Sequence, residues 1–446
     1  MAEIGVTTDT HAVNIETMSP ARRLRNVLGG SAGNLVEWFD WFAYASFSVY
    51  FASVFFPAGD QTTQFLQSAA VFSVGFIARP MGAWLMGVYA DRAGRRAALM
   101  LAVSMMCFGS LLIAVLPGYA QIGIFAPILL ALARVIQGVS VGGEFGASAT
   151  YVSEMAGKHR RGFWSGFLYV TLIAGQLLAV MLLLLLQAVL TPEQLQAWGW
   201  RIPFVVGACL AVIVFWLRRN MNETTSFEKT EGVQDRGKTM LLFLKYPKAT
   251  AVVFILSAAG SMSFYSFTTY MQKFLINSAA GPAGEGFSKG QAAQIMTWVL
   301  FLFMLMQPLA GWISDKTGRK PIVAVGFGIG ALAVIPLFHA IQGATSGAQA
   351  VVLCMIPLVL LSGYTATSAI LKAEFFPAHV RALGVALPYA LAQALFGGTT
   401  EAVALQFKKS GFETGFFYVL AGAQLIAFVC ALVMRDSQKH SLIADD

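Results

Sequence analysis

The sequence predicts an all-α membrane protein in which twelve transmembrane helices form two pseudo-symmetric six-helix bundles. Three observations support this fold class: the chain is unusually apolar, its apolar runs are regularly spaced, and two loop motifs recur in its second half. Of the 446 residues, 57% are hydrophobic and 12% are charged, whereas roughly 25% of the residues of ordinary soluble domains are charged. This composition excludes a soluble globular protein.

The apolar runs are each long enough to cross a hydrocarbon core of about 30 Å as an α-helix, which takes about 20 residues. They show neither the length nor the strict alternation of barrel strands, which disfavours a transmembrane barrel. The predicted spans are 28–56, 64–90, 97–116, 122–153, 163–190, 201–217, 249–278, 290–314, 321–341, 349–373, 384–407 and 413–434.

The distribution of positive charge predicts the topology. Most of the 30 Lys and Arg residues fall in the termini and in the loops that follow even-numbered spans. Cytoplasmic loops carry such an excess, so both termini are expected in the cytoplasm. The first twenty residues lack the pattern of a signal peptide. Basic loops that face anionic lipid explain the net charge of +8, so no nucleic-acid partner is expected.

Two loop motifs occur once in each half of the chain. The segment G-V-Y-A-D-R-A-G-R-R contains Asp91, and G-W-I-S-D-K-T-G-R-K contains Asp315, 224 residues later. In the same way, a glutamate precedes an arginine by seven positions after the fourth and the tenth span. These pairs are Glu154 with Arg161 and Glu374 with Arg381.

The repeated motifs indicate a duplicated six-helix unit. The predicted domains are an N-terminal bundle at 1–217, a charged cytoplasmic linker at 218–248 and a C-terminal bundle at 249–446. Parallel six-helix repeats with a binding site at their interface are typical of secondary transporters.

The loop motifs also predict contacts that form and break as the halves move. Asp91 and Asp315 can accept hydrogen bonds from helix ends or pair with arginine. Gly94 and Gly318 can supply turn residues without a Cβ. The candidate gating residues are Gly87, Asp91, Arg92, Gly94, Arg95, Glu154, Arg161, Asp315, Gly318, Arg319, Glu374 and Arg381.

Ionisable residues inside the spans are concentrated in the first half. A charge at the centre of a span costs about 2.5 to 3.5 kcal/mol, so such residues are functional candidates. The first half contains Glu37, Asp40, Arg79, Arg134 and Glu144. The positions 224 residues later are uncharged, namely Ser261, Phe264, Phe303, Leu358 and Ser368. The predicted site is therefore asymmetric.

The arginines are interpreted as ligands of an anionic substrate, because a guanidinium binds a carboxylate through planar, bidentate hydrogen bonds. A buried carboxyl group can carry a proton, since desolvation favours its neutral form. The alternative is an inert network of ion pairs that ties the bundle together. The substrate-binding candidates are Arg79, Arg134, Tyr44, Lys273, Tyr364 and Gln307. The proton-coupling candidates are Glu37, Asp40 and Glu144, with Glu401 as an alternative.

Other residues of the spans give weaker signals. Gly138, Gly142 and Gly146 recur every four residues and predict close approach of a neighbouring helix. Lys372 is interpreted as a snorkelling or gate residue. Tyr389 and Gln393 are individually weak signals, and packing or anchoring is the favoured explanation of such residues.

Several motifs are missing from the sequence. It has no phosphate-binding Gly-Lys-Ser/Thr loop and no Cys/His spacing of a metal site. No arrangement of Ser, His and Asp or of paired carboxylates points to a catalysed reaction. We therefore expect neither an enzyme nor a nucleotide-driven pump, and no metal or cofactor apart from a proton gradient.

The repeated loops resemble the signature of the major facilitator superfamily. "GNLVEWFDWF", "GFIARPMGAWLMGVYADRAGRR", "RVIQGVSVGGEFGASATYVSE" and "ILKAEFFPAHVRALGV" are similar to its metabolite:proton symporter family. The resemblance implies a multi-pass inner-membrane importer, expected as a monomer, that couples uptake of a small organic anion to protons by alternating access. The expected substrate is 2-oxoglutarate. Citrate, a C4 dicarboxylate and shikimate are alternatives, as is a receptor or channel that does not concentrate its ligand.

Overall fold

The computed structural model describes residues 20–57, 59–93, 95–142, 149, 160–219, 245–376 and 378–443. Within these ranges the regular secondary structure is entirely helical. The first half contains α1 (Pro20–Phe55), α2 (Gln61–Ala93), α3 (Arg95–Val115), α4 (Tyr119–Ile122), α5 (Phe125–Val141), α7 (Arg161–Val189), α8 (Pro192–Ala197), the 3₁₀ turn η3 (Gly199–Arg201) and α9 (Ile202–Arg219).

The second half is described from residue 245 onward and has two helices interrupted by π-helical segments. It contains α12 (Pro247–Tyr265), η4 (Ser266–Tyr270), α13 (Met271–Asn277), α14 (Lys289–Thr317), α15 (Arg319–Gln342), α16 (Gly347–Glu374), α17 (Ala378–Ala392), η5 (Gln393–Gly397), α18 (Thr400–Lys409) and α19 (Glu413–Val433). Each predicted span overlaps a long helix or helices in series, although the second part of the span at 122–153 lies largely outside the described residues, and the helical architecture confirms the predicted fold class.

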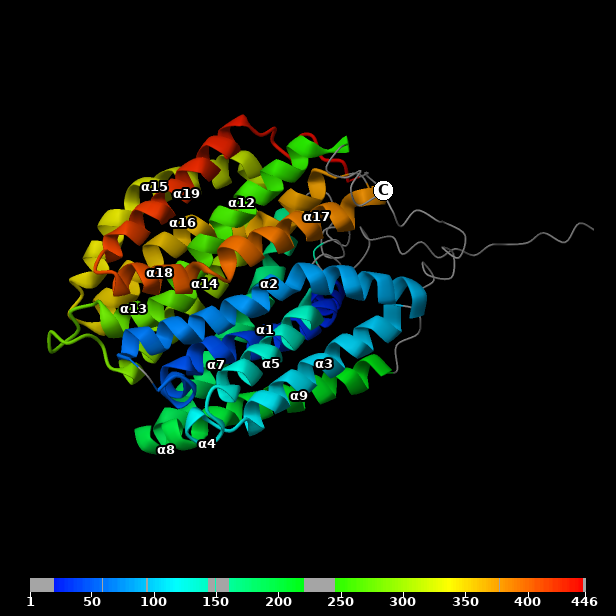
Figure 1. The fold of residues 1–446 in the computed structure, drawn as a ribbon. Helices are drawn as coiled ribbons and strands as arrows, with labels where there is room; N and C mark the ends of the chain where they lie inside the picture. The colour runs from blue at the N-terminus through cyan, green and yellow to red at the C-terminus, as the bar shows by residue number, and fades with distance from the viewer. Residues whose placement is uncertain are drawn as a thin grey trace, which may run out of the picture.

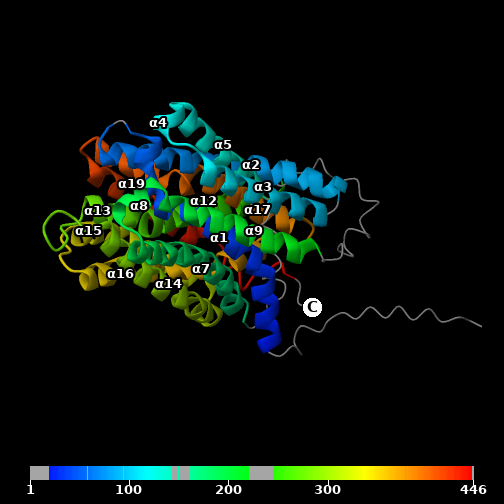
Figure 2. The ribbon, with the colours of Figure 1, turned by 90° about the horizontal axis from the view of Figure 1, so that it is seen from below.

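In Figure 1 the helices of the first half lie below those of the second half, and Figure 2 shows the same bundle from below, with the first half toward the viewer. Eight described segments are long and apolar enough to cross a membrane. We call the end of the bundle with Asp315 and Glu374 the linker end. The end with Lys273 and Lys289 is the far end. The C-terminus lies at the linker end, on the right in Figure 1.

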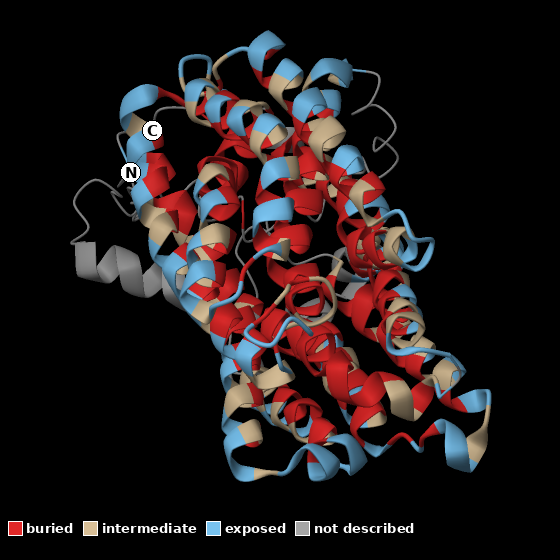
Figure 3. Cartoon of the chain, turned by 90° about the vertical axis from the view of Figure 1, so that its left-hand side faces the viewer, coloured by how far each residue is buried: buried red, intermediate tan, exposed pale blue. Residues whose placement is uncertain are grey.

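The outer surface of the bundle is apolar. Leu332 is 82% exposed and Val433 is 81% exposed, and buried residues concentrate where helices face one another (Figure 3). A soluble monomer rarely exposes large contiguous apolar patches. These outward-facing side chains are therefore suited to contact lipid chains.

Glycines allow α5 to pack directly on the backbone of α2. A Cβ on Gly138 would collide with the carbonyl of Gly75, and one on Gly142 would collide with the carbonyl of Arg79. The predicted close approach is confirmed at these two positions, while Gly146 lies outside the described residues. The close approach fixes the backbone that carries Arg79.

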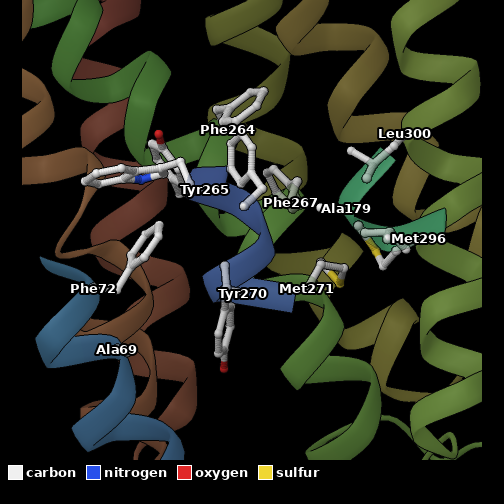
Figure 4. Packing of buried hydrophobic residues seen from close by; sticks show 14 of the residues in the cluster. Ala69, Phe72, Ala179, Phe264, Tyr265, Phe267, Tyr270, Met271, Met296 and Leu300 are labelled. Atoms are coloured by element: carbon white, nitrogen blue, oxygen red, sulfur yellow. The ribbon is translucent and has the colours of Figure 1, made fainter. Parts of the chain in front are cut away.

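Aromatic side chains join the cores of the two halves. The ring of Tyr265 in α12 lies 5.3 Å from that of Phe76 and 6.4 Å from that of Phe72, both in α2. Figure 4 shows Phe72 and Phe264 near Tyr265 at this junction. Aromatic contacts therefore bury the interface between the halves in this region.

Candidate functional site

A narrow cavity of about 20 Å³, large enough for about one water molecule, lies between the two halves and is partly open to solvent. Helices α1, α2 and α5 supply one wall, and α17 with the start of η5 supplies the other. The lining residues are Asn34, Glu37, Trp38, Arg79, Val141, Gly142, Ala386, Tyr389, Ala390 and Gln393. Two sequence-predicted residues, Arg79 and Glu37, thus share this cavity.

Arg79 is held by aromatic rings. Its guanidinium carbon lies 4.0 Å from the ring centre of Phe76, 4.1 Å from that of Trp41 and 4.9 Å from that of Trp38. The side chain is buried, yet its Nε and Nη2 atoms have no hydrogen-bond partner in the described part of the chain. A buried guanidinium with donors to spare on a cavity wall is suited to bind a carboxylate in a bidentate manner.

Arg134 contacts the same indole but is not a lining residue. Its guanidinium carbon lies 3.9 Å from the Trp41 ring centre and 4.6 Å from that of Tyr44. Its Nη1 donates to Oε1 of Gln137 at 2.7 Å. The structure therefore brings both predicted arginines to Trp41, but only Arg79 faces the cavity.

Asp40 lies inside the first half and is fully buried. Its Oδ1 accepts a hydrogen bond from Ser110 at 2.5 Å, and its Oδ2 accepts one from Nε2 of Gln137 at 2.6 Å. Gly207 of α9 makes room for this carboxylate, because a Cβ there would collide with it. Gln137 thus links Asp40 to Arg134, in a network whose residues do not line the Glu37 cavity.

The three-residue spacing of the two acids explains their separation. Residues three apart on a helix differ by about 60° in direction. Glu37 therefore meets the second half across the cavity, while Asp40 turns toward α3, α5 and α9.

Lys273 forms a buried ion pair at the far end. Its Nζ lies 3.1 Å from Oε1 of Glu401 and donates to the carbonyl of Ala45 at 2.6 Å. Lys289 donates to the carbonyl of Val49, one turn further along α1, at 2.8 Å. Two lysines of the second half therefore hold α1 of the first half at this end.

The structure does not bring the other three predicted substrate ligands to the cavity wall. The Tyr44 hydroxyl donates to the carbonyl of Ser68 at 3.0 Å. The Tyr364 hydroxyl lies 3.4 Å from that of Ser257. Gln307 accepts a hydrogen bond from Thr365 at 2.8 Å. Their contact with substrate stays a prediction.

Asp315 joins the halves at the linker end. Its carboxylate accepts the backbone N–H groups of Gly162 and Phe163, at the start of α7, at 2.7 and 2.9 Å. Arg319 pairs with the same carboxylate at 2.9 Å. Asp315 thus makes both kinds of contact that the loop motif predicts. Gly318 has a φ of +95° between α14 and α15, which favours glycine.

The C-terminal tail covers this network. Ser437 donates to Oε2 of Glu374, and Arg381 donates to the carbonyl of Leu442 at 2.9 Å. Ile443 belongs to a buried cluster that also contains Leu168 of the first half and Ile370 of the second. The tail therefore joins a cluster formed by both halves at the linker end, an arrangement that sequence analysis did not predict.

Several predicted residues cannot be placed. Glu144, Glu154 and Gly94 lie outside the described residues. Gly87, Asp91, Arg92 and Arg95 belong to α2 or α3, but their side chains are not described. Arg161 begins α7 and is buried. The gating role of all these residues stays a prediction.

Tyr389 and Gln393 are cavity residues that sequence analysis did not select. Nε2 of Gln393 donates to the Tyr389 hydroxyl at 2.6 Å. They share a helical face with Ala386 and Ala390, a spacing that predicts one small-and-polar surface. This spacing could have identified Tyr389 and Gln393 as cavity residues from the sequence. Across the described residues, no group of His, Cys, Asp and Glu could hold a metal ion.

The chain is similar to several known proteins. Residues 27–250 and 249–439 match the family described as "Sugar (and other) transporter". The chain is 48% identical to the alpha-ketoglutarate permease of Escherichia coli (strain K12), covering 98% of this chain and 99% of the permease. It is 31% identical to the citrate-proton symporter of Salmonella typhi, covering 86% and 87%.

A solved structure shows the same fold. The partially occluded, inward-open xylose transporter XylE from E. coli matches with a TM-score of 0.72 and 18% identity, covering 92% of this chain and 97% of that one.

Proposed function

The chain belongs to the family of sugar and other transporters within the major facilitator superfamily, and from this premise we propose that it imports 2-oxoglutarate together with protons by alternating access. The substrate is proposed because the chain is 48% identical, over nearly its whole length, to a permease named for alpha-ketoglutarate. Relatives named as proton symporters support the coupling.

This proposal rests on one observation: Arg79 and Glu37 line the same cavity between the halves. The Arg79 guanidinium binds a substrate carboxylate. Glu37 binds the proton, since a carboxylate near the substrate can gain or lose a proton as the cavity changes access. Arg134 and Asp40 support the site through Gln137 and Trp41.

The contacts at the two ends supply the gates. In this proposal the linker end faces the cytoplasm with both termini, and Asp315 releases α7 when that end opens. The lysine contacts with α1 break when the far end opens. Each half can then rock around a substrate held between them.

Uptake by proteoliposomes with an imposed pH gradient tests the proposal. Labelled 2-oxoglutarate should accumulate, and a protonophore should abolish the accumulation. Uptake to equilibrium only, insensitive to the protonophore, would indicate a channel or receptor instead.

A panel of unlabelled competitors identifies the substrate among the anions. We expect 2-oxoglutarate to compete best. Stronger competition by citrate would favour the function named for the Salmonella typhi relative, while a C4 dicarboxylate or shikimate would identify the remaining alternatives.

A further inference from the structure

The ring of Tyr389 separates Lys372 from the cavity. It belongs to the last turn of α16 and is fully buried. Its Nζ lies 3.9 Å from the ring centre of Tyr389 and 5.8 Å from that of Tyr364. Tyr389 in turn lines the cavity together with Arg79. A second basic group, from the other half of the molecule, thus stands behind the cavity wall.

The burial of this ammonium group is costly. Removing a charged lysine from water is unfavourable, and the ring of Tyr389 is one of the groups that stabilise the cation. Packing alone would be served better by Leu or Met, which have a similar length without the charge. The position of Lys372 at the interface of the halves therefore indicates a role for its charge.

The helix that carries Tyr389 is locally irregular. Pro388 immediately precedes this residue, and the π-helical segment η5 begins at Gln393. Proline removes one backbone hydrogen bond from the helix, and π-helical turns are frequent at functional sites. A small rearrangement of this segment would turn the Tyr389 ring and open the cavity to Lys372.

We propose that Lys372 binds the second carboxylate of a dicarboxylate substrate whose first carboxylate is bound by Arg79. This inference rests on the proposed function and extends it. Arg79 comes from the first half and Lys372 from the second, so a substrate with two carboxylates bridges the halves. A lysine ammonium is a point charge on a flexible stem, which suits a carboxylate whose position changes as the halves rock.

Direct ligand titration of the purified full-length protein tests this assignment, with tryptophan fluorescence as the readout because Trp38 lines the cavity. The two ligands are 2-oxoglutarate and 2-oxovalerate, which has the same carbon chain with a methyl group in place of the distal carboxylate. Lys372→Met should raise the Kd for 2-oxoglutarate about 10- to 100-fold, the range expected for one charged hydrogen bond. The Kd for 2-oxovalerate should stay within about twofold of the wild-type value.

Lys316→Met is the matched control. Lys316 also lies in the last turn of a long helix and its Nζ is 3.7 Å from the ring centre of Trp312, but it is exposed. This variant should bind both ligands as the wild type does. Lys372→Arg should retain the preference for the dicarboxylate. If Lys372→Met does not fold, Lys372→Gln provides the neutral variant.

Two results would overturn the assignment. In the first, a neutral Lys372 variant still prefers 2-oxoglutarate over 2-oxovalerate as strongly as the wild type does. In the second, the neutral variant raises the Kd for both ligands by the same factor. In either case the proposed function survives. A wild-type protein that binds both ligands equally well would overturn the proposed function as well.

Discussion

The carboxylate of Asp315 accepts the backbone N–H of Gly162 at 2.7 Å, so a residue of the second half caps a helix of the first half. The first N–H groups of a helix have no partner within it, and the helix dipole makes this end electropositive. A carboxylate there satisfies two donors at once, since Phe163 also donates to it. The contact must break if the linker end opens, which makes it a suitable gate.

Replacing Asp315 with alanine should loosen the start of α7. Loss of a helix cap costs about 0.5 to 2 kcal/mol, equivalent to roughly 2- to 30-fold in an equilibrium constant. The exchange of the Gly162 and Phe163 amide hydrogens with deuterium should accelerate by this factor. Glu413→Ala, at the far end, should leave these amides unchanged. Unchanged exchange in Asp315→Ala would contradict a capping role.

Replacing Arg79 with lysine should impair uptake although the charge is kept. A lysine cannot form the planar pair of hydrogen bonds to a carboxylate. Truncation to alanine should cost more, because breaking a buried charged contact costs about 2 to 5 kcal/mol. We expect Arg79→Ala to reduce the uptake efficiency for 2-oxoglutarate by at least about 30-fold. The membrane insertion of this variant must first be verified. If it then took up 2-oxoglutarate at the wild-type rate, Arg79 would not be a substrate ligand.

The two acids of α1 should respond differently to neutral replacements. Glu37→Gln should abolish accumulation driven by a pH gradient and spare exchange of labelled for unlabelled substrate, because the cavity keeps its shape. Accumulation and exchange are measured in the same proteoliposomes. Full accumulation of substrate by Glu37→Gln would show that another carboxylate carries the proton.

Asp40→Asn should reduce stability as well as transport. Both oxygens of Asp40 accept hydrogen bonds, from Ser110 and Gln137, and an asparagine presents a donor in place of one of them. Leaving a buried polar group unsatisfied costs about 1 to 3 kcal/mol. The melting temperature of the purified variant should fall accordingly. An unchanged melting temperature would show that the network accommodates the amide.

Much of the fold could be predicted because it depends on patterns that are local in sequence. Apolar length defined the spans, and the four-residue glycine repeat identified Gly138 and Gly142 as packing positions. The loop motif similarly predicted the kind of contact that Asp315 makes. Each of these features requires only the geometry of one helix or one turn.

The site was less predictable because it depends on how the helices rotate against one another. Helix α1 is buried on all sides from Trp38 to Ala52, so its apolar pattern could not indicate which acid faces the other half. Tyr389 and Lys372 are 17 positions apart and lie on different helices. Their contact depends on tertiary packing, which the sequence pattern does not encode.

Gly138→Ala should destabilise the first half. The added methyl group would collide with the carbonyl of Gly75, a backbone atom that cannot move without shifting α2. Overpacking of this kind costs about 1 to 3 kcal/mol. The measurement is the melting temperature of the purified protein, which should fall. Gly422→Ala is the matched control, because a Cβ at this position in α19 meets no atom within 4 Å and alanine favours a helix. Its melting temperature should stay equal to that of the wild type or rise.

Ile443→Ala should release the C-terminal tail from the linker end. Ile443 is 7% exposed and belongs to a buried cluster with side chains from both halves, whereas the neighbouring Leu442 is 50% exposed. Truncating a buried Ile costs about 2 to 5 kcal/mol when the site cannot collapse, and a tail can detach instead. Limited proteolysis should therefore cleave the last ten residues faster in Ile443→Ala than in the wild type. The control, Leu442→Ala, should be cleaved at nearly the wild-type rate because its backbone contacts with Glu374 and Arg381 remain. Equal cleavage of both variants would mean that the buried Ile443 side chain does not anchor the tail.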